Sequence, residues 1–257
     1  MTASQFVKLI TAPLLARTRS DRRAANHRLL SWLNRRAGFR IYNRDLYWID
    51  EDPTPGLIDA LERPVEFNDR KRILQGLARS VALLPGDTAE CGTFEGASSW
   101  IIAEAMEPAD DYRHHIFDSF EGLSEPGSDD RVADEKTREW VRGDLCGPLD
   151  LVKRNLSGFD FIDYHRGWIP EAFPGVEDRR FKLVHIDVDL YQPTWDSLAF
   201  FYPRMVPGGV ILCDDYGSTR CPGAHRAMDE FFEGKPEGPV VDLLNGQGLS
   251  IKRMPAA

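Results

Sequence analysis

The sequence is poor in cysteine and in long apolar runs, and each shortage excludes a class of protein. Its 257 residues include only four cysteines, Cys91, Cys146, Cys213 and Cys221, which are too scattered for a disulfide scaffold or a C-x-x-C zinc site. No stretch approaches the ~18 consecutive apolar residues of a membrane-spanning helix, and no signal-peptide pattern is present. We therefore expect a cytoplasmic protein without a transmembrane segment.

The sequence also lacks net positive charge and the short motifs of several enzyme classes. Its formal net charge is −9, which argues against nucleic acid as a partner, because binding to phosphate backbones depends on clustered lysine and arginine. No glycine-rich loop ends in Gly-Lys-Ser/Thr, and no G-x-S-x-G elbow occurs. Nucleoside triphosphate hydrolysis and serine hydrolase chemistry are therefore disfavoured.

Charge is distributed unevenly, and the first 40 residues are basic. They contain nine lysines and arginines against one acidic residue, Asp21, with apolar residues between them at roughly helical spacing. This pattern is typical of a solvated cap helix, and it would also suit an anionic membrane surface or an acidic neighbouring subunit of a homo-oligomer. We predict a basic, helical N-terminal extension over residues 1–65 and a second domain over residues 66–257.

Short apolar segments alternate with helical patterns in the rest of the chain. After an amphipathic helix over Lys71–Leu84, strands are expected at Thr88–Cys91, His114–Phe117, Phe161–His165, Lys182–Ile186 and Gly209–Cys213. Crossover helices are expected at Ser98–Met106, Leu149–Leu156, Pro193–Tyr202 and Gly223–Phe232. This order predicts an α/β fold with a doubly wound, mostly parallel sheet. A C-terminal antiparallel hairpin over Val240–Leu243 and Leu249–Lys252 would close it.

The turn after the first expected strand has the composition of a nucleotide-binding loop. Gly92 and Gly96 allow a tight turn and the close approach of a ligand to the backbone before a helix begins near Ser98. Asp118 ends the second expected strand, where a doubly wound fold places an acid against ribose hydroxyls. The loop and the acid together predict a nucleoside cofactor, although each alone is compatible with an ordinary turn.

Four carboxylates follow two further expected strands, in the segments His185–Tyr191 and Val210–Tyr216; they are Asp187, Asp189, Asp214 and Asp215. If the strands are neighbours, these side chains converge at the carboxyl edge of the sheet, where open α/β folds bind ligands. Like charges this close raise one another's pKa unless a cation neutralises them, and oxygen donors favour Mg²⁺. The alternative is that one aspartate of each pair caps the following helix.

Histidine gives no comparable signal. Four histidines lie in or beside expected strands, where a core histidine is more common than a ligand: His114, His115, His165 and His185. No histidine spacing supports a zinc site. We assign no histidine to catalysis.

Taken together, the motifs resemble those of the macrocin O-methyltransferase family, class I enzymes that methylate sugar hydroxyls with S-adenosylmethionine. The resemblance covers roughly residues 85–232, and it is carried by Gly86–Gly92 with Gly96 and Ser98, Asp118–Leu123, Gly167-Trp168, Asp187–Tyr191 and Pro207–Tyr216. It implies a cofactor site formed by Glu90, Gly92, Thr93, Gly96, Ser98, Asp118, Ser119, Gly167 and Trp168. It further implies that Asp187, Asp214 and Asp215 ligate Mg²⁺, and that Asp187 and Asp189 are catalytic, with Asp189 as the general base.

The expected function is therefore S-adenosylmethionine- and Mg²⁺-dependent methylation of a sugar hydroxyl on a glycosylated natural product, a nucleotide sugar or a surface polysaccharide. The acidic loop Leu123–Glu135 is expected to form a lid over this acceptor. Three alternatives stay open. They are a catechol-type O-methyltransferase, a glycosyltransferase that uses Asp187-Val188-Asp189 as a metal-binding D-x-D motif, and a non-catalytic binding protein with the same fold.

Overall fold

A computed structural model of the chain describes residues 69–106, 111–133 and 137–254, together with Lys8, Thr11, Ala12 and Leu15. The chain divides into two compact units, Met1–Asp52 and Pro53–Ala257. The four described residues of the first unit are helical. The rest of the expected basic extension, and the expected boundary after residue 65, lie outside the described residues.

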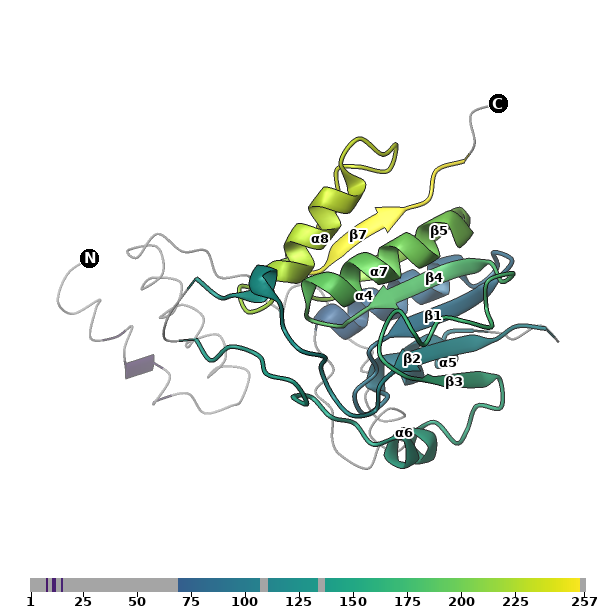
Figure 1. Cartoon of the computed structure of the whole chain (residues 1–257), viewed down its shortest axis with the longest axis horizontal. Helices are drawn as coiled ribbons and strands as arrows, with labels where there is room; N and C mark the ends of the chain where they lie inside the picture. Colours follow the sequence, from purple (N-terminus) through teal and green to yellow (C-terminus); the bar gives the residue numbers. More distant parts are fainter. Residues whose placement is uncertain are drawn as a thin grey trace. The chain divides into compact units, whose positions relative to one another are not determined.

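The described part of the second unit contains a seven-stranded sheet in the order β3-β2-β1-β4-β5-β7-β6. The strands are β1 Asp87–Cys91, β2 His114–Asp118, β3 Ile162–Arg166, β4 Phe181–Ile186, β5 Met205–Cys213, β6 Val241–Asp242 and β7 Gly248–Ile251. Strands β1 to β5 pair in parallel, whereas β7 is antiparallel to both β5 and β6. The expected doubly wound, mostly parallel sheet with a C-terminal hairpin is therefore confirmed (Figure 1).

Helices cover both faces of this sheet. They are α4 Asp69–Val81, α5 Ala97–Glu104, α6 Leu149–Asn155, α7 Tyr191–Phe201 and α8 Pro222–Phe232. Helices α4, α5 and α6 contribute to the two hydrophobic clusters on one face, and α7 and α8 contribute to the cluster on the other face, which is nearer the viewer in Figure 1. Strands β1 and β4 are buried along their whole length because they lie between the two helix layers.

Strand β5 is longer than its sequence predicts. It begins at Met205, whereas Pro207-Gly208-Gly209 is a turn signal and suggested a start at Gly209. The pairing with β4 changes register here, because Phe181 faces Met205 but Leu183 faces Val210. The extra residues form an irregular stretch in which Gly208 donates its N–H to the carbonyl of Lys252. The strand therefore continues through the turn-like residues as a bulge.

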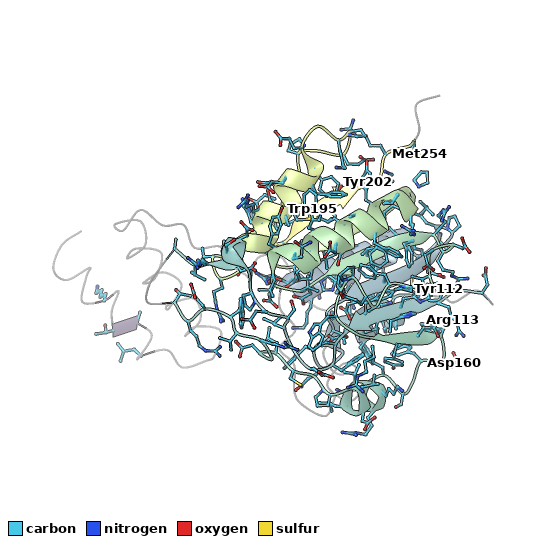
Figure 2. All side chains as sticks on the ribbon, in the orientation of Figure 1. Tyr112, Arg113, Asp160, Trp195, Tyr202 and Met254 are labelled. Atoms are coloured by element: carbon cyan, nitrogen blue, oxygen red, sulfur yellow. The ribbon has the colours of Figure 1, made fainter. Side chains whose placement is uncertain are left out.

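The carboxyl ends of the parallel strands lie at one edge of the sheet. Strand order reverses at β1, which has β2 on one side and β4 on the other. In an open α/β sheet this reversal leaves a crevice outside the strand ends, because the connections leave in opposite directions. Tyr112, Arg113 and Asp160, labelled in Figure 2, precede β2 and β3 and mark the opposite, amino edge.

Candidate functional site

The loop after β1 can exist only with glycine at its first position. Gly92 has a φ of 80°, and a Cβ there would lie 1.9 Å from the carbonyl oxygen of Asp187. The ends of β1 and β4 are therefore in direct backbone contact, and the N–H of Asp187 donates to the carbonyl of Cys91. Gly96, with a φ of 93°, turns the chain into α5. The predicted glycine turn thus forms the floor of the crevice.

Asp118, the last residue of β2, holds this loop in place. Its Oδ2 accepts the backbone N–H of Thr93 at 2.8 Å, and its Oδ1 accepts that of Phe120 at 2.6 Å. Burial raises the pKa of Asp118, while these backbone donors act in the opposite direction. Each carboxylate oxygen has a second lone pair. The carboxylate can therefore accept hydrogen bonds from a ligand without releasing the loop.

A cavity of about 240 Å³ opens between this loop, the end of β2 and the end of β4. Five of the predicted cofactor residues line it: Gly92, Asp118, Ser119, Gly167 and Trp168. Asp187, Val188 and Asp189 form another part of its wall, and apolar side chains such as that of Ile169 complete it. Predicted cofactor residues and predicted catalytic residues therefore share one cavity.

The other predicted cofactor residues lie elsewhere. Thr93 and Gly96 shape the loop through backbone contacts, and Ser98 lines a second, smaller cavity. Glu90 lines neither of these two cavities among the described residues. Its side chain is fully buried inside the sheet layer, where it accepts hydrogen bonds from Ser99 and from His185 Nδ1. Glu90 therefore reaches the second cavity only through side chains that line it, His185 and Ser98.

The four aspartates are brought to the same edge, but the structure divides them into two groups. Ligand atoms of Asp187 and Asp214 lie within 4.8 Å of one another and of His185, whereas Asp215 is grouped with Asp189 and Cys221. Asp214 and Asp215 lie in the turn that follows β5, and their side chains contact different partners: Asp214 accepts from Arg70 and Gln247, and Asp215 accepts the N–H of Asp189. Asp215 also acts on the first group, because its charge is among the causes that raise the pKa of Asp187.

Asp214 is the most strongly partnered carboxylate of the cluster. Arg70 Nη1 donates to its Oδ2 at 2.8 Å, and Gln247 Nε2 donates to its Oδ1 at 2.7 Å. Burial alone would raise the pKa of Asp214, but hydrogen bonding and charge from His185 and the charge of Arg70 lower it below its usual range. Asp214 is therefore ionised at neutral pH.

The pKa values of the two neighbouring carboxyls, Asp187 and Asp215, shift in the opposite direction to that of Asp214. Burial, together with the charges of Asp214 and Asp215, raises the pKa of Asp187 well above its usual range. Burial and the charge of Asp189 raise the pKa of Asp215 to about 8. Such mutual repulsion is the condition that a bound cation relieves.

Asp189 is held in an unusual conformation. Its φ is 60°, which is rare for a residue other than glycine, and such backbone strain is common at functional sites. Its N–H donates to Asp215 Oδ2 at 3.1 Å, and the thiol of Cys221 donates to its Oδ1 at 3.3 Å. Burial raises the pKa of Asp189. Asp215 therefore orients Asp189.

Four residues of this site were not predicted: Arg70, His185, Cys221 and Gln247. For His185 a signal was present, since it stands near the end of β4, two residues before Asp187, which directly follows that strand. Arg70 and Gln247 come from α4 and from the turn before β7, far from Asp214 in sequence. No local pattern connects them to the acidic cluster.

The expected lid, Leu123–Glu135, is described as far as residue 133 and is anchored at several points. Leu123 and Ser124 line the cavity. Asp130, which is buried, accepts the N–H of Gly127 and that of Tyr191 at the start of α7, each at 2.7 Å. The acidic side chain of Asp130 therefore holds the loop against the start of α7.

Among the residues that the structure describes, no helix is long and apolar enough to span a membrane.

The arrangement has counterparts among solved structures and defines a class I O-methyltransferase fold. The O-methyltransferase NovP superposes with a TM-score of 0.60 at 22% identity, covering 88% of this chain and 96% of NovP. The calicheamicin methyltransferase CalS11 also gives 0.60, at 19% identity, covering 83% of this chain and 98% of CalS11. The model of the macrocin-O-methyltransferase family matches residues 68–236. The chain belongs to this family.

Curated relatives show similar sequences over part of their length. A tetracenomycin-C rhamnosyl 4'-O-methyltransferase of Streptomyces olivaceus is 32% identical over 145 residues, which cover 54% of this chain and 56% of the relative. The demethyldecarbamoylnovobiocin O-methyltransferase of Streptomyces niveus is 31% identical over 156 residues, or 58% of each chain. The chain thus spans little more than half of these two relatives. The mycinamicin III 3''-O-methyltransferase of Micromonospora griseorubida is 31% identical over 182 residues, covering 66% of this chain and 69% of that enzyme.

Proposed function

We propose that this protein is an S-adenosylmethionine-dependent O-methyltransferase that acts on a sugar hydroxyl of a glycosylated natural product, a nucleotide sugar or a surface polysaccharide. One observation carries the proposal. The cavity formed by Gly92 and Asp118 is also lined by Asp187 and Asp189, so a nucleoside cofactor and an acceptor hydroxyl would meet beside acidic side chains. Family membership and the names of the relatives, one of which is named for a rhamnosyl compound, support the same assignment.

The residues of the cavity fit such a cofactor. Asp118 offers free lone pairs to ribose hydroxyls, Gly92 lets the ligand approach the backbone, and Trp168 provides an aromatic wall. The indole N–H of Trp168 donates to the carbonyl of Gly122 at 3.4 Å, which fixes the ring. When bound, S-adenosylmethionine supplies an electrophilic methyl group on its sulfonium. The chain's contribution is to hold that group in line with the acceptor oxygen.

The acidic edge fits a divalent cation. Asp187 and Asp214 present carboxylate oxygens to one cavity wall, and a cation there would relieve the repulsion that raises the pKa of Asp187. When bound, the cation, expected as Mg²⁺ from the oxygen donors, lowers the pKa of a coordinated sugar hydroxyl and orients it. Asp215, the third proposed ligand, accepts the N–H of Asp189 through Oδ2 and keeps Oδ1 for the cation.

Asp189 is the proposed general base. Its carboxylate lines the cofactor cavity, and Cys221 donates only to Oδ1. Oδ2 can therefore receive the proton of the acceptor hydroxyl as the methyl group is transferred. The raised pKa of Asp189 suits this step, because a base is more effective when its pKa lies closer to the working pH. The division of Asp187 and Asp189 between two groups argues against the D-x-D glycosyltransferase alternative, which needs both carboxylates on one cation.

Calorimetric titration with S-adenosylhomocysteine tests the cofactor part of this proposal. The wild-type protein should bind it, with or without EDTA, because the cofactor cavity does not depend on the cation. Asp118→Ala should weaken binding at least tenfold, since it removes the acceptor for ribose and releases the loop at Thr93. Asp150→Ala, which removes an exposed aspartate at the start of α6, is the matched control. Absence of binding to the wild type would refute the proposed function.

A further inference from the structure

Backbone strain is concentrated around the cofactor cavity. Among the described residues other than glycine, four have a left-handed φ, and three of these line the cavity: Phe94, Leu145 and Asp189. A bulky side chain rarely adopts such a φ, and such outliers cluster at functional sites. Asp189 is the proposed general base, whereas Phe94 and Leu145 carry no group that takes part in proton or methyl transfer. Their strain therefore needs a different explanation.

Leu145, with a φ of 59°, belongs to a strap formed by residues 143–147. The strap is hydrogen-bonded to the loop that follows β2. The N–H of Leu123 donates to the carbonyl of Asp144 at 2.8 Å, and the N–H of Gly143 donates to the carbonyl of Leu123 at 2.9 Å. Both bonds involve the residues just before Leu145, so they fix the chain where it enters the strained conformation.

Two close backbone contacts fix the strap on either side of Leu145. A Cβ on Gly122 would lie 2.5 Å from the carbonyl oxygen of Asp144, and a Cβ on Gly147 would lie 1.7 Å from the carbonyl oxygen of Phe94. Only glycine permits these approaches. Leu145 therefore cannot relax to an ordinary φ unless the strap leaves the loops after β1 and β2.

Phe94, with a φ of 51°, is held from the other side. Its backbone contacts Gly147 of the strap. Its N–H is also one of the backbone donors to the carboxylate of Asp118, the proposed acceptor for ribose hydroxyls. The backbone around Phe94 therefore connects the strap to the residue that would hold the cofactor.

The side chains of Phe94 and Leu145 are apolar and open to solvent. Phe94 is 46% exposed and Leu145 is 44% exposed, although both line a cavity of about 240 Å³. Single apolar side chains on a surface are ordinary, but here a strained backbone holds two of them at one cavity. A ligand that fills the cavity would cover them and displace the water around them, which is favourable.

We propose that Phe94 and Leu145 form an apolar clamp that covers the bound cofactor and slows its release, and that the strap holds Leu145 in its strained conformation for this purpose. The inference rests on the cofactor site of the proposed function. Asp118 supplies polar recognition of the ribose, and the clamp adds a contact that depends on apolar area. Affinity gained by such a contact is expressed mainly in the dissociation rate.

Stopped-flow and calorimetric measurements with S-adenosylhomocysteine test the clamp in the full-length protein. Leu145→Asn replaces the apolar side chain by a polar one of similar size that tolerates a left-handed φ. This variant should release S-adenosylhomocysteine about tenfold faster and bind it about tenfold more weakly, because most of the burial of one leucine side chain is lost. Its Tm should not fall, because the backbone strain is reduced.

Three further variants separate the apolar contact from the fold of the strap. Leu145→Met keeps the apolar side chain and should stay within about twofold of the wild-type affinity. Phe94→Asn should accelerate release as Leu145→Asn does. Val141→Asn is the matched control, because Val141 lies just before the strap and is 52% exposed but lines a separate cavity beside Trp140. Its release rate should equal that of the wild type.

The outcomes distinguish the clamp from the proposed function. Wild-type binding of S-adenosylhomocysteine, with an unchanged release rate in Leu145→Asn and Phe94→Asn, would overturn the clamp and leave the cofactor site standing. Equal acceleration in Val141→Asn would also overturn the clamp, since the effect would then come from the strap as a whole. Failure of the wild type to bind would overturn the cofactor site and the clamp together. If Leu145→Asn does not fold, Phe94→Asn decides.

Discussion

At the scale of single residues, a substitution of Asp214 should impair cation-dependent methyl transfer and leave cofactor binding nearly unchanged. It lines the smaller cavity beside Ser98 and His185, where we propose that the cation binds, but not the cofactor cavity. Asp214→Asn should lower the rate of methyl transfer at least 100-fold, about 3 kcal/mol of transition-state stabilisation, because an amide is a poor cation ligand. The affinity for S-adenosylhomocysteine should change less than about twofold. Asp242→Asn, an exposed change in β6, serves as the control. Retained turnover in purified Asp214→Asn would refute the cation role.

The neutral, buried state of His114 makes stability depend on pH. Burial lowers the pKa of His114 to about 4, whereas a histidine of the unfolded chain keeps its ordinary pKa of 6.5. The unfolded state therefore binds more protons below pH 6.5, so stability is full above that pH and falls as the pH drops toward 4. Urea unfolding should show the wild type losing about 2 kcal/mol more than His114→Gln between pH 7 and 5. Parallel losses in the two proteins would contradict this assignment.

The sequence was informative about individual residues when a motif specified both their type and their place. Asp118 and Gly92 follow strands in a known order, and both line the cavity. The grouping of Asp215 with Asp189 and Cys221 could not be predicted, because the motif Asp214-Asp215 names two acids but not the side chains beside them. Glu90, also predicted at the cofactor, is fully buried near the end of β1, and its contact with His185 was not predictable because it joins two strands far apart in sequence.

At the scale of elements, the junction between β1 and β4 depends on glycine. Gly92→Ala would add both a strained φ and a collision with the carbonyl of Asp187, whereas Gly208→Ala, at the same φ of 80°, would meet only Leu84 Cδ1 at 3.5 Å. We expect Gly208→Ala to cost about 1 kcal/mol, from the left-handed conformation alone. Gly92→Ala should cost more than about 2 kcal/mol and weaken S-adenosylhomocysteine binding.

Chemical denaturation of the two alanine variants, followed by calorimetry, checks this difference. Equal destabilisation of the two would show that the contact with Asp187 carries no energetic weight. Intact cofactor affinity in a folded Gly92→Ala protein would show that the loop does not form the site.

Helices and strands of the sheet were predictable because hydrophobic periodicity and glycine turns agree over most of the region after residue 69. Strand β5 was the exception. Its register shift against β4 and its pairing with Lys252 are tertiary effects, and they override the turn signal of Pro207-Gly208-Gly209. Arg70 and Gln247 reach Asp214 for the same kind of reason, since only the packing of α4 and the C-terminal hairpin on β5 brings them together.

At the scale of the whole molecule, the three described hydrophobic clusters are built from residues between 74 and 249. A protein lacking residues 1–52 should therefore keep a cooperative thermal transition, with a Tm within a few degrees of that of the full chain. Differential scanning calorimetry would measure this, and loss of the transition would show that the first unit is needed for folding.

Removal of residues 1–40 tests a separate hypothesis about assembly. We propose a homo-oligomer in which this basic segment, with its nine lysines and arginines, docks on an acidic neighbouring subunit. Light scattering should then show a lower mass for the truncated protein than for the intact one. An unchanged mass in solution would refute the docking.

The central claim is methyl transfer to a sugar hydroxyl, and transfer of a tritiated methyl group from S-adenosylmethionine tests it most directly. The acceptors would be deoxysugar glycosides, nucleoside diphosphate sugars and, for comparison, a catechol, each with a divalent cation and with EDTA. We predict label in a sugar acceptor that depends on the cation and is lost in Asp189→Asn. Label in the catechol alone, or label in a sugar that persists undiminished in Asp189→Asn and in EDTA, would contradict the account.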